Sequence, residues 1–203
     1  MVASLRAELG AAQPSFDIRL PPGWVRMDAS DVSRDALLER TRARFLEAHR
    51  PDLWAQSRGS IMRAFDDLRR MRGDALMLPL EAGRGAPFVP ASVTAATVFA
   101  EGGLDEHVAR LVAQGATALD GDRRFLRDES TEEAVIDGVR IAATTVRYLT
   151  PVPRTRRTRA LLLTAALPHP ADLPPDDRLL SATRALIDGM VSTFRWLPTR
   201  ERG

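Results

Sequence analysis

Two segments of strand length meet at the dipeptide Asp137-Gly138, and this arrangement constrains the fold more than any other feature. The segments cover residues 133–136 and 139–149. An Asp-Gly pair readily adopts the backbone angles of a two-residue β-hairpin loop. Alternation with a period of two places every second side chain on the same face of a sheet. The sequence therefore predicts a central antiparallel hairpin within a meander of strands.

Further strands are expected on both sides of this hairpin. Four more segments of strand length are bounded by turn residues, at 75–80, 92–100, 123–127 and 159–167. Near the start, residues 16–20 alternate apolar and charged side chains, and a Pro-Pro-Gly turn leads to a return strand that begins at Trp24. Residues 194–196 form a last strand or continue the final helix.

Four other segments have a helical period. They span about 31–48, with Asp31 or Ser33 as N-cap, 51–72, 104–114 and 176–191. Residues 1–13 are rich in alanine and are expected to form a short helix or a loose tail. No repeat or low-complexity linker divides the sequence, so residues 1–203 are expected to form a single domain.

Composition excludes several classes of chemistry. The 203-residue chain has 44% hydrophobic and 28% charged residues, which are values of a globular protein. It has no cysteine and no lysine, which excludes disulfides, thiolate nucleophiles and lysine Schiff bases. Arginine as the only strongly basic residue indicates a GC-rich, bacterial genome. The net charge of +2 is too small to indicate nucleic-acid binding by itself.

No targeting or membrane signal is evident, so a cytoplasmic location is expected. The N-terminal residues lack the apolar core of a signal peptide. No apolar run approaches the ~20 residues that a membrane-spanning helix needs.

No motif for catalysis, metal binding or cofactor binding is present. The three histidines, His49, His107 and His169, are far apart in sequence and lack the spacing of a zinc-binding helix. We expect His49 at a helix end, His107 on the polar side of a helix and His169 in a proline-bounded loop. Residues 83–85 form a Gly-Arg-Gly sequence without the lysine of a phosphate-binding loop. The sequence therefore predicts a protein that is not an enzyme and has no cofactor.

The most distinctive polar segment lies between two predicted strands. Four arginines follow a proline-rich stretch there, namely Arg154, Arg156, Arg157 and Arg159. Guanidinium groups at a hairpin tip are suited to phosphates or to an acidic partner, because they form forked hydrogen bonds with both. The alternative is a solvated loop that protects the sheet from aggregation.

Tryptophan supplies a second kind of candidate contact. Trp24 and Trp54 are interpreted as core anchors, whereas Trp196 is suited equally to a core and to a partner surface. The predicted partner-binding residues are therefore the four arginines together with Trp196.

Three segments resemble the Mog1/PsbP-like family. They are Phe16-Asp17-Ile18-Arg19-Leu20-Pro21-Pro22-Gly23-Trp24, the hairpin tip Asp137-Gly138, and the closing helix with Ser192-Thr193-Phe194-Arg195-Trp196. The resemblance covers about residues 14–197. It implies an α+β fold in which an antiparallel sheet is packed between helices, an α/β/α sandwich. Residues 33–72 depart from it, because they predict two long helices where smaller members have one short helix; this region is an insertion or indicates a different fold.

The resemblance also implies a class of function. Members of the family are mostly non-enzymatic and bind a small GTPase, photosystem components or bacterial secretion effectors. The leading hypothesis is therefore an accessory module that binds another protein, acidic or related to secretion. One alternative is a small-molecule pocket, or an unrecognised hydrolase, between the sheet and the long helices, lined by Trp54, Phe65 and Phe99. The other is an arginine-mediated contact with nucleic acid or phosphate.

Overall fold

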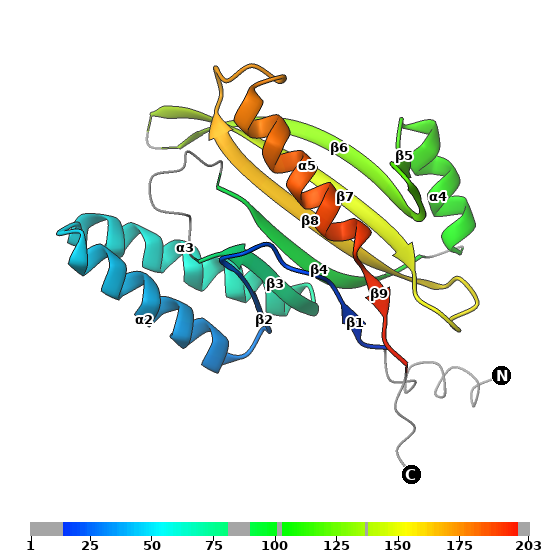
Figure 1. The fold of residues 1–203 in the computed structure, drawn as a ribbon, viewed down its shortest axis with the longest axis horizontal. Helices are drawn as coiled ribbons and strands as arrows, with labels where there is room; N and C mark the ends of the chain where they lie inside the picture. The colour runs from blue at the N-terminus through cyan, green and yellow to red at the C-terminus, as the bar shows by residue number, and fades with distance from the viewer. Residues whose placement is uncertain (1–13, 81–89, 101–102, 137, 199–203) are drawn as a thin grey trace, which may run out of the picture.

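A computed structural model describes residues 14–80, 90–100, 103–136 and 138–198. Its main feature is a seven-stranded antiparallel sheet with the strand order β2-β3-β4-β8-β7-β6-β5 (Figure 1). The strands are β2 (Trp24–Met27), β3 (Gly73–Pro79), β4 (Ser92–Phe99), β5 (Thr117–Leu119), β6 (Asp122–Ile136), β7 (Val139–Pro151) and β8 (Arg159–Pro170). The predicted α+β architecture with an antiparallel sheet is confirmed. The predicted loop at 83–85 and the N-terminal tail lie outside the described residues.

The predicted hairpin around Asp137-Gly138 is confirmed by its register. Ile136 of β6 pairs with Val139 of β7, and Gly138 has a φ of 78°. β6 is longer than predicted, because 123–127 and 133–136 belong to one continuous strand. The polar residues between them remain in the strand because they form cross-strand ion pairs, such as that of Asp128 with Arg147. β5 was not predicted, since three residues are too few to show alternation.

Helices cover both faces of the sheet (Figure 1). They are α2 (Asp31–Glu47), α3 (Pro51–Arg70), α4 (Leu104–Ala113) and α5 (Arg178–Ser192). On one face, α5 packs Leu180, Ile187 and Val191 into the largest core cluster. On the other face, α2 and α3 cover the β2–β3 end and α4 covers the opposite end. Among the described residues, no helix is both long and apolar enough to cross a membrane.

The two long helices at 33–72 form a layer of their own. Leu37 of α2 and Phe65 and Leu68 of α3 are buried against Leu76 and Leu80. The N-cap of α2 is Ser30 rather than the predicted Asp31 or Ser33, because the Ser30 hydroxyl accepts a hydrogen bond of 3.1 Å from the Ser33 amide. Gly73 follows α3 where a Cβ would lie 2.2 Å from Leu68, so this position requires glycine.

The two ends of the described chain form a second, two-stranded sheet. β1 (Phe16–Asp17) pairs with β9 (Arg195–Trp196), with Phe16 opposite Trp196. The predicted hairpin between residues 16–20 and the strand starting at Trp24 is therefore wrong, since that strand, β2, pairs with β3. The intervening Pro21-Pro22 lacks amide donors for a ladder, and the Arg19 amide instead donates to Thr193 Oγ1 at 2.8 Å.

The aromatic residues of both end segments share one core. Phe16 stacks on Phe194 with ring centroids 5.4 Å apart, and Trp196 meets Phe194 edge-on at 5.0 Å. Trp24 and Trp196 are both half-buried against the cluster that includes α5. Residues 194–196 end the fold as a strand and do not continue the helix.

Candidate functional site

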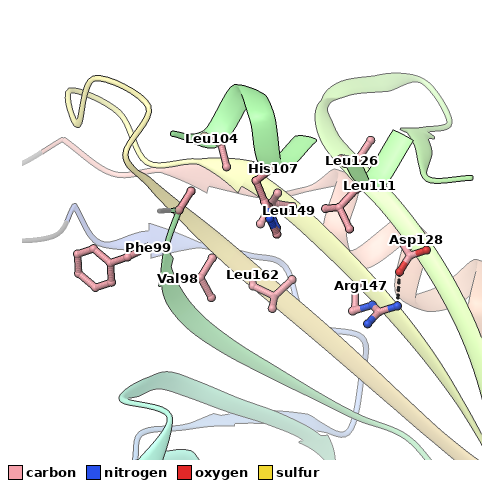
Figure 2. Close-up of a pocket in the computed structure, with 11 residues that line it drawn as sticks. Val98, Phe99, Leu104, His107, Leu111, Leu126, Asp128, Arg147, Leu149 and Leu162 are labelled. Carbon is pink, nitrogen blue, oxygen red and sulfur yellow. Dashed lines mark ion pairs between the residues drawn. The ribbon is translucent and has the colours of Figure 1, made fainter. Parts of the chain in front are cut away.

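A pocket of about 270 Å³ lies between α4 and the sheet, and we call it the α4 pocket (Figure 2). Its lining comes from β4, the segment after β4, α4, β6, β7 and β8. The lining residues are Val98, Phe99, Ala100, Leu104, His107, Leu111, Leu126, Asp128, Arg147, Leu149 and Leu162. The pocket is therefore largely apolar, with a small number of polar groups, as is common in binding sites.

A row of leucines across neighbouring strands forms the floor of the pocket. Leu126 of β6 lies opposite Leu149 of β7, which lies opposite Leu162 of β8. Directly opposed residues in an antiparallel sheet point to the same face, so the register places the three side chains side by side. Their neighbours in sequence, such as Leu161 and Leu163, are buried on the α5 face instead. The apolar floor therefore results from strand register.

The helix α4 closes the pocket from above. Its N-terminal residue Leu104 is almost completely buried, and its amide donates a hydrogen bond of 2.9 Å to the Arg157 carbonyl. Gly103, with a φ of 100°, turns the chain into the helix. Leu111, one turn further than His107, lines the pocket from the same side of α4. The helix is thus attached to the sheet at its N-terminus, beside the β7–β8 connection.

Polar groups occupy defined positions in this apolar site. Asp128 and Arg147 face each other across β6 and β7 as an ion pair at one end of the pocket, and Phe99 lies at the other end (Figure 2). His107 reaches the pocket from α4 between them. The prediction that His107 lies on a polar helix face is wrong, because the sheet lies beneath that side of α4.

The chemistry that the lining can supply is limited to a few side-chain types. None of the lining residues carries a hydroxyl or thiol that His107 could activate as a nucleophile. The carboxylate of Asp128 is already paired with Arg147. In the described part of the chain, no three histidine, aspartate or glutamate side chains gather as a metal site. The pocket therefore offers an apolar cavity with a neutral ion pair and one imidazole.

An arginine-rich connection borders the pocket, and we call residues 154–159 the arginine loop. The predicted hairpin-tip position is confirmed, because the loop joins β7 to β8. Arg157 donates from Nε to Asp105 Oδ1 of α4 at 2.7 Å. The guanidinium of Arg159 lies 5.1 Å from the ring centroid of Phe99. Phe99 is 58% exposed, so an apolar ring and a cation are together accessible at the pocket rim.

The backbone of the arginine loop has an unusual conformation. Arg154, Arg156 and Arg157 have φ angles of 64°, 50° and 58°, in the left-handed region that is costly for residues other than glycine. Two threonine hydroxyls hold the turn, since Thr155 donates to the Val152 carbonyl at 2.8 Å and Thr158 donates to the Thr155 carbonyl at 2.7 Å. The loop is therefore held in one shape, and such strain is concentrated at functional sites.

The five residues predicted for partner binding fall into two places. The four arginines belong to one loop, which contacts α4 through Arg157, and Arg154 and Arg156 of this loop are exposed and make no ion pair with any described residue. Trp196 lies in the β1–β9 sheet and packs against Phe16 and Phe194. The arginine loop and Trp196 thus lie on different elements, and partner binding by either stays a prediction.

The pocket predicted between the sheet and the long helices does not bring its three named residues together. Phe65 is fully buried between α3 and β3, whereas Phe99 lines the α4 pocket. Trp54 belongs to α3, which covers the other end of the sheet. Sequence reasoning identified the amphipathic helix at 104–114 but not the leucine floor beneath it, because no local period reveals which strands become neighbours.

The other two histidines lie on separate elements. His169 is in β8 rather than in the predicted loop, where its Nε2 lies 3.0 Å from Thr144 Oγ1 and its Nδ1 lies 2.9 Å from the Pro170 carbonyl oxygen. His49 lies in the turn between α2 and α3, at the predicted helix end. The three imidazoles thus belong to α4, to β8 and to that turn.

Comparison with known proteins gives only distant structural similarity. No protein-family model and no curated protein sequence matches this chain. A protein of Bacteroides thetaiotaomicron VPI-5482 has 8% identity and a TM-score of 0.44, with 93% of this chain and 47% of that chain covered. The Ran-binding protein Mog1p of Saccharomyces cerevisiae has 12% identity and a TM-score of 0.33, with 60% of this chain and 78% of that chain covered. The cyanobacterial PsbP of Synechocystis sp. PCC 6803 has 12% identity and a TM-score of 0.30, with 93% of this chain and 95% of that chain covered.

Mog1 and PsbP, after which the resembled family is named, are thus both among the structural neighbours. This chain spans about half the length of the Bacteroides structure. With TM-scores below 0.5, these similarities transfer neither a partner nor an activity.

Proposed function

We propose that this chain is a non-enzymatic module that binds an acidic segment of another protein at the α4 pocket and the arginine loop. In this proposal, one apolar side chain of the partner enters the pocket and neighbouring carboxylates meet the arginines. The observation that carries the proposal is an apolar cavity bordered by the arginine loop, in which Arg154 and Arg156 are exposed and make no ion pair with any described residue.

The size of the pocket favours a side chain as its occupant. Its volume of about 270 Å³ lies just below the range of roughly 300–1,000 Å³ that is typical of sites for drug-sized ligands. An aliphatic or aromatic anchor from a partner would be buried against the leucine floor. Such central apolar anchors, surrounded by polar contacts, supply most of the affinity in many protein interfaces.

The charges at the rim favour an acidic neighbourhood around that anchor. Arginine binds carboxylates through two parallel hydrogen bonds, and the restrained backbone of the loop lowers the entropy lost on binding. Arg157 and Arg159 are already held by Asp105 and Phe99, so Arg154 and Arg156 are the arginines available for new pairs. Because both are exposed, the interaction should weaken as salt concentration rises.

A peptide-binding measurement tests this proposal. The probe is a labelled acidic peptide with one central leucine, and its matched control has alanine in that place. We expect the leucine peptide to bind at least ten times more tightly. Leu111→Trp, which fills the pocket, and the double variant Arg154→Glu/Arg156→Glu should each weaken binding at least tenfold.

A double variant with the same charge change elsewhere is the control. Arg42 and Arg70 are exposed on α2 and α3, so Arg42→Glu/Arg70→Glu should leave binding nearly unchanged. Binding that survives both the filled pocket and the reversed arginine loop would contradict the proposal. Binding of a single-stranded oligonucleotide in place of the peptide, lost on reversal of the loop, would favour the nucleic-acid alternative.

A second candidate function is the binding of a small apolar carboxylate. The leucine floor, together with Arg159 beside Phe99 at the rim, favours it, since the floor suits the apolar chain and a guanidinium suits the carboxylate. A medium-chain fatty acid is a suitable probe. Chemical-shift changes confined to α4 and the floor strands, abolished by Leu111→Trp, would support this function over peptide binding.

A further inference from the structure

The outer edge of β6 is open over most of its length. β5 pairs only with Asp122, Leu126 and Arg127 of β6. β7 pairs with β6 on the inner side along the whole stretch from Leu126 to Ile136. Within the described parts of the chain, no strand pairs with the outer side of residues 128–136. Beyond its short pairing with β5, β6 is the outermost strand on this side of the sheet (Figure 1).

The hairpin register shows which backbone groups face outward. Ile136 and Val139 flank a two-residue turn and therefore form a hydrogen-bonded pair. Hydrogen-bonded and non-bonded pairs alternate along an antiparallel ladder, so the even-numbered residues of β6 direct their amides and carbonyls toward β7. The outward set consists of Glu129, Thr131, Glu133 and Val135.

This edge lacks most of the features that protect exposed strands. Residues 128–136 contain no proline or glycine, and their register with β7 continues without a bulge. The side chains from Thr131 to Val135 are exposed, and Val135 is 68% exposed. Four carboxylates are the remaining protection, namely Asp128, Glu129, Glu132 and Glu133.

The same carboxylates disfavour a second copy of this chain as the occupant. Two β6 edges related by a two-fold axis would pair symmetrically about one residue. Centring the pair on Glu132 or Glu133 places that glutamate opposite itself, and centring on Thr131 places Glu129 opposite Glu133. Centring on Ala134 avoids like charges but pairs only residues 132–136 of each edge, because the hairpin turn follows Ile136. Like charges directly opposite each other destabilise a sheet.

We infer that the outer edge of β6 accepts an extended basic segment of another protein as an added antiparallel strand. Glu132 makes no ion pair with any described residue, and the Glu133–Arg140 pair is exposed, so both carboxylates are accessible to cations. Lysine or arginine in the added strand would neutralise them, and an apolar residue would cover Val135. The backbone hydrogen bonds would supply affinity and the charges specificity. This inference is independent of the α4 pocket.

Nuclear magnetic resonance titration with a defined peptide tests the inference. The probe is a peptide of about ten residues in which two adjacent lysines lie among valines and threonines, so that the lysines can face Glu132 and Glu133 while a valine faces Val135. We expect amide shifts concentrated at 129–135 and new cross-strand contacts to the peptide. A peptide with N-methyl groups on the amides that would face β6 should bind at least tenfold more weakly, as should one with glutamate in place of lysine.

Two variants at one position separate the backbone from the charge. Glu133→Pro removes an outward amide without removing a bond to β7, whereas Glu133→Ala removes only the carboxylate. Proline should weaken peptide binding at least fivefold beyond alanine, and Leu111→Trp should not change it. If Glu133→Pro does not fold, the N-methylated peptide on the native protein decides the same question.

Other results would overturn the inference. Equal binding of the methylated and unmethylated peptides would show that no strand is added. Shifts centred on α4 would place the peptide at the other site. A dimer in the absence of peptide, lost in Glu133→Pro, would show that a second copy occupies the edge.

Discussion

The hydroxyl of Tyr148 on β7 donates a hydrogen bond of 2.5 Å to the carboxylate of Asp188 on α5. Arg127 of β6 donates to the same carboxylate oxygen at 2.9 Å and to Glu129 at 2.8 Å. The tyrosine side chain is completely buried within the main core cluster. This network therefore joins the helix to the two long strands beneath it.

Removal of this hydroxyl should destabilise the protein without altering its fold. We expect Tyr148→Phe to lower the free energy of unfolding by about 1–2 kcal/mol, since Asp188 keeps its bond to Arg127. Asp188→Ala should cost more, about 2–3 kcal/mol, because it leaves the buried hydroxyl and Arg127 without this partner. Urea unfolding of both variants checks the prediction. Equal stability of Tyr148→Phe and the native protein would show that the bond contributes nothing.

Tyr148 should also control stability at alkaline pH. Burial raises the pKa of Tyr148 well above its ordinary value, and the hydrogen bond and charge of Asp188 raise it further. Because the pKa of Tyr148 is higher in the folded state, the neutral tyrosine stabilises the fold. This contribution is complete below the unfolded pKa of about 10 and is lost as pH rises toward the folded pKa. The free energy of unfolding should therefore fall by about 1.4 kcal/mol per pH unit above about pH 10.

The composition makes this pH effect easy to assign. The chain has one tyrosine, no lysine and no cysteine, so no other side chain has an ordinary pKa between about 8 and 12. Urea unfolding at a series of pH values should show the slope in the native protein and not in Tyr148→Phe. Ultraviolet absorbance of tyrosinate in the folded protein at about pH 10 would contradict the prediction.

The contact between the two end strands should contribute strongly to stability. Trp196 packs edge-on against Phe194 at 5.0 Å and against Phe16 at 6.4 Å. We expect Trp196→Ala to lower the free energy of unfolding by about 2–3 kcal/mol, because it leaves a cavity beside both rings. Phe99→Ala, at an exposed position, is the matched control and should cost less than about 1 kcal/mol. Similar losses in both variants would contradict a core role for Trp196.

The neighbouring ion pair should be visible as a shifted titration. Arg195 donates to the Asp17 carboxylate at 2.6 and 3.0 Å, and this hydrogen bond is the main cause that lowers the pKa of Asp17. A carboxyl group whose pKa is lower in the folded state stabilises that state at pH values above its unfolded pKa. This contribution is lost as pH falls through the folded pKa. Arg195→Ala should return the pKa of Asp17 toward its ordinary value, measured by carboxyl-carbon magnetic resonance. An unchanged pKa would show that the pair is broken in solution.

Local patterns predicted most elements of this fold. The Asp137-Gly138 turn, the strands near 75–80, 92–100 and 159–167, and the four helices agree with the structure to within a few residues. Each of these elements has a period or a turn residue that acts over short distances. The continuity of β6 was not predicted, because its polar middle shows no apolar period. Its carboxylates Asp128 and Glu129 pair with Arg147 and Arg127, and the pairing with Arg147 depends on the neighbouring strand β7.

The candidate site was predicted in part. The arginine loop was placed correctly at a hairpin tip, and its role in partner binding stays a prediction. The sequence did not indicate that Arg157 would meet Asp105 or that Arg159 would cover Phe99, because these residues are separated by more than 50 positions. Trp196 was suited equally to a core and to a surface contact, and the structure places it half-buried in the aromatic cluster of the end strands.

By itself, the sequence determined most of the segments that become strands and helices, and it determined the antiparallel hairpin, because turn chemistry and hydrophobic period act locally. The tertiary structure alone decided which strands became neighbours. Pairing Phe16 with Trp196, aligning three leucines under α4 and leaving the outer side of β6 open all depend on the register between distant segments. That register follows from burying apolar clusters on both faces of the sheet at once, and no local pattern encodes it.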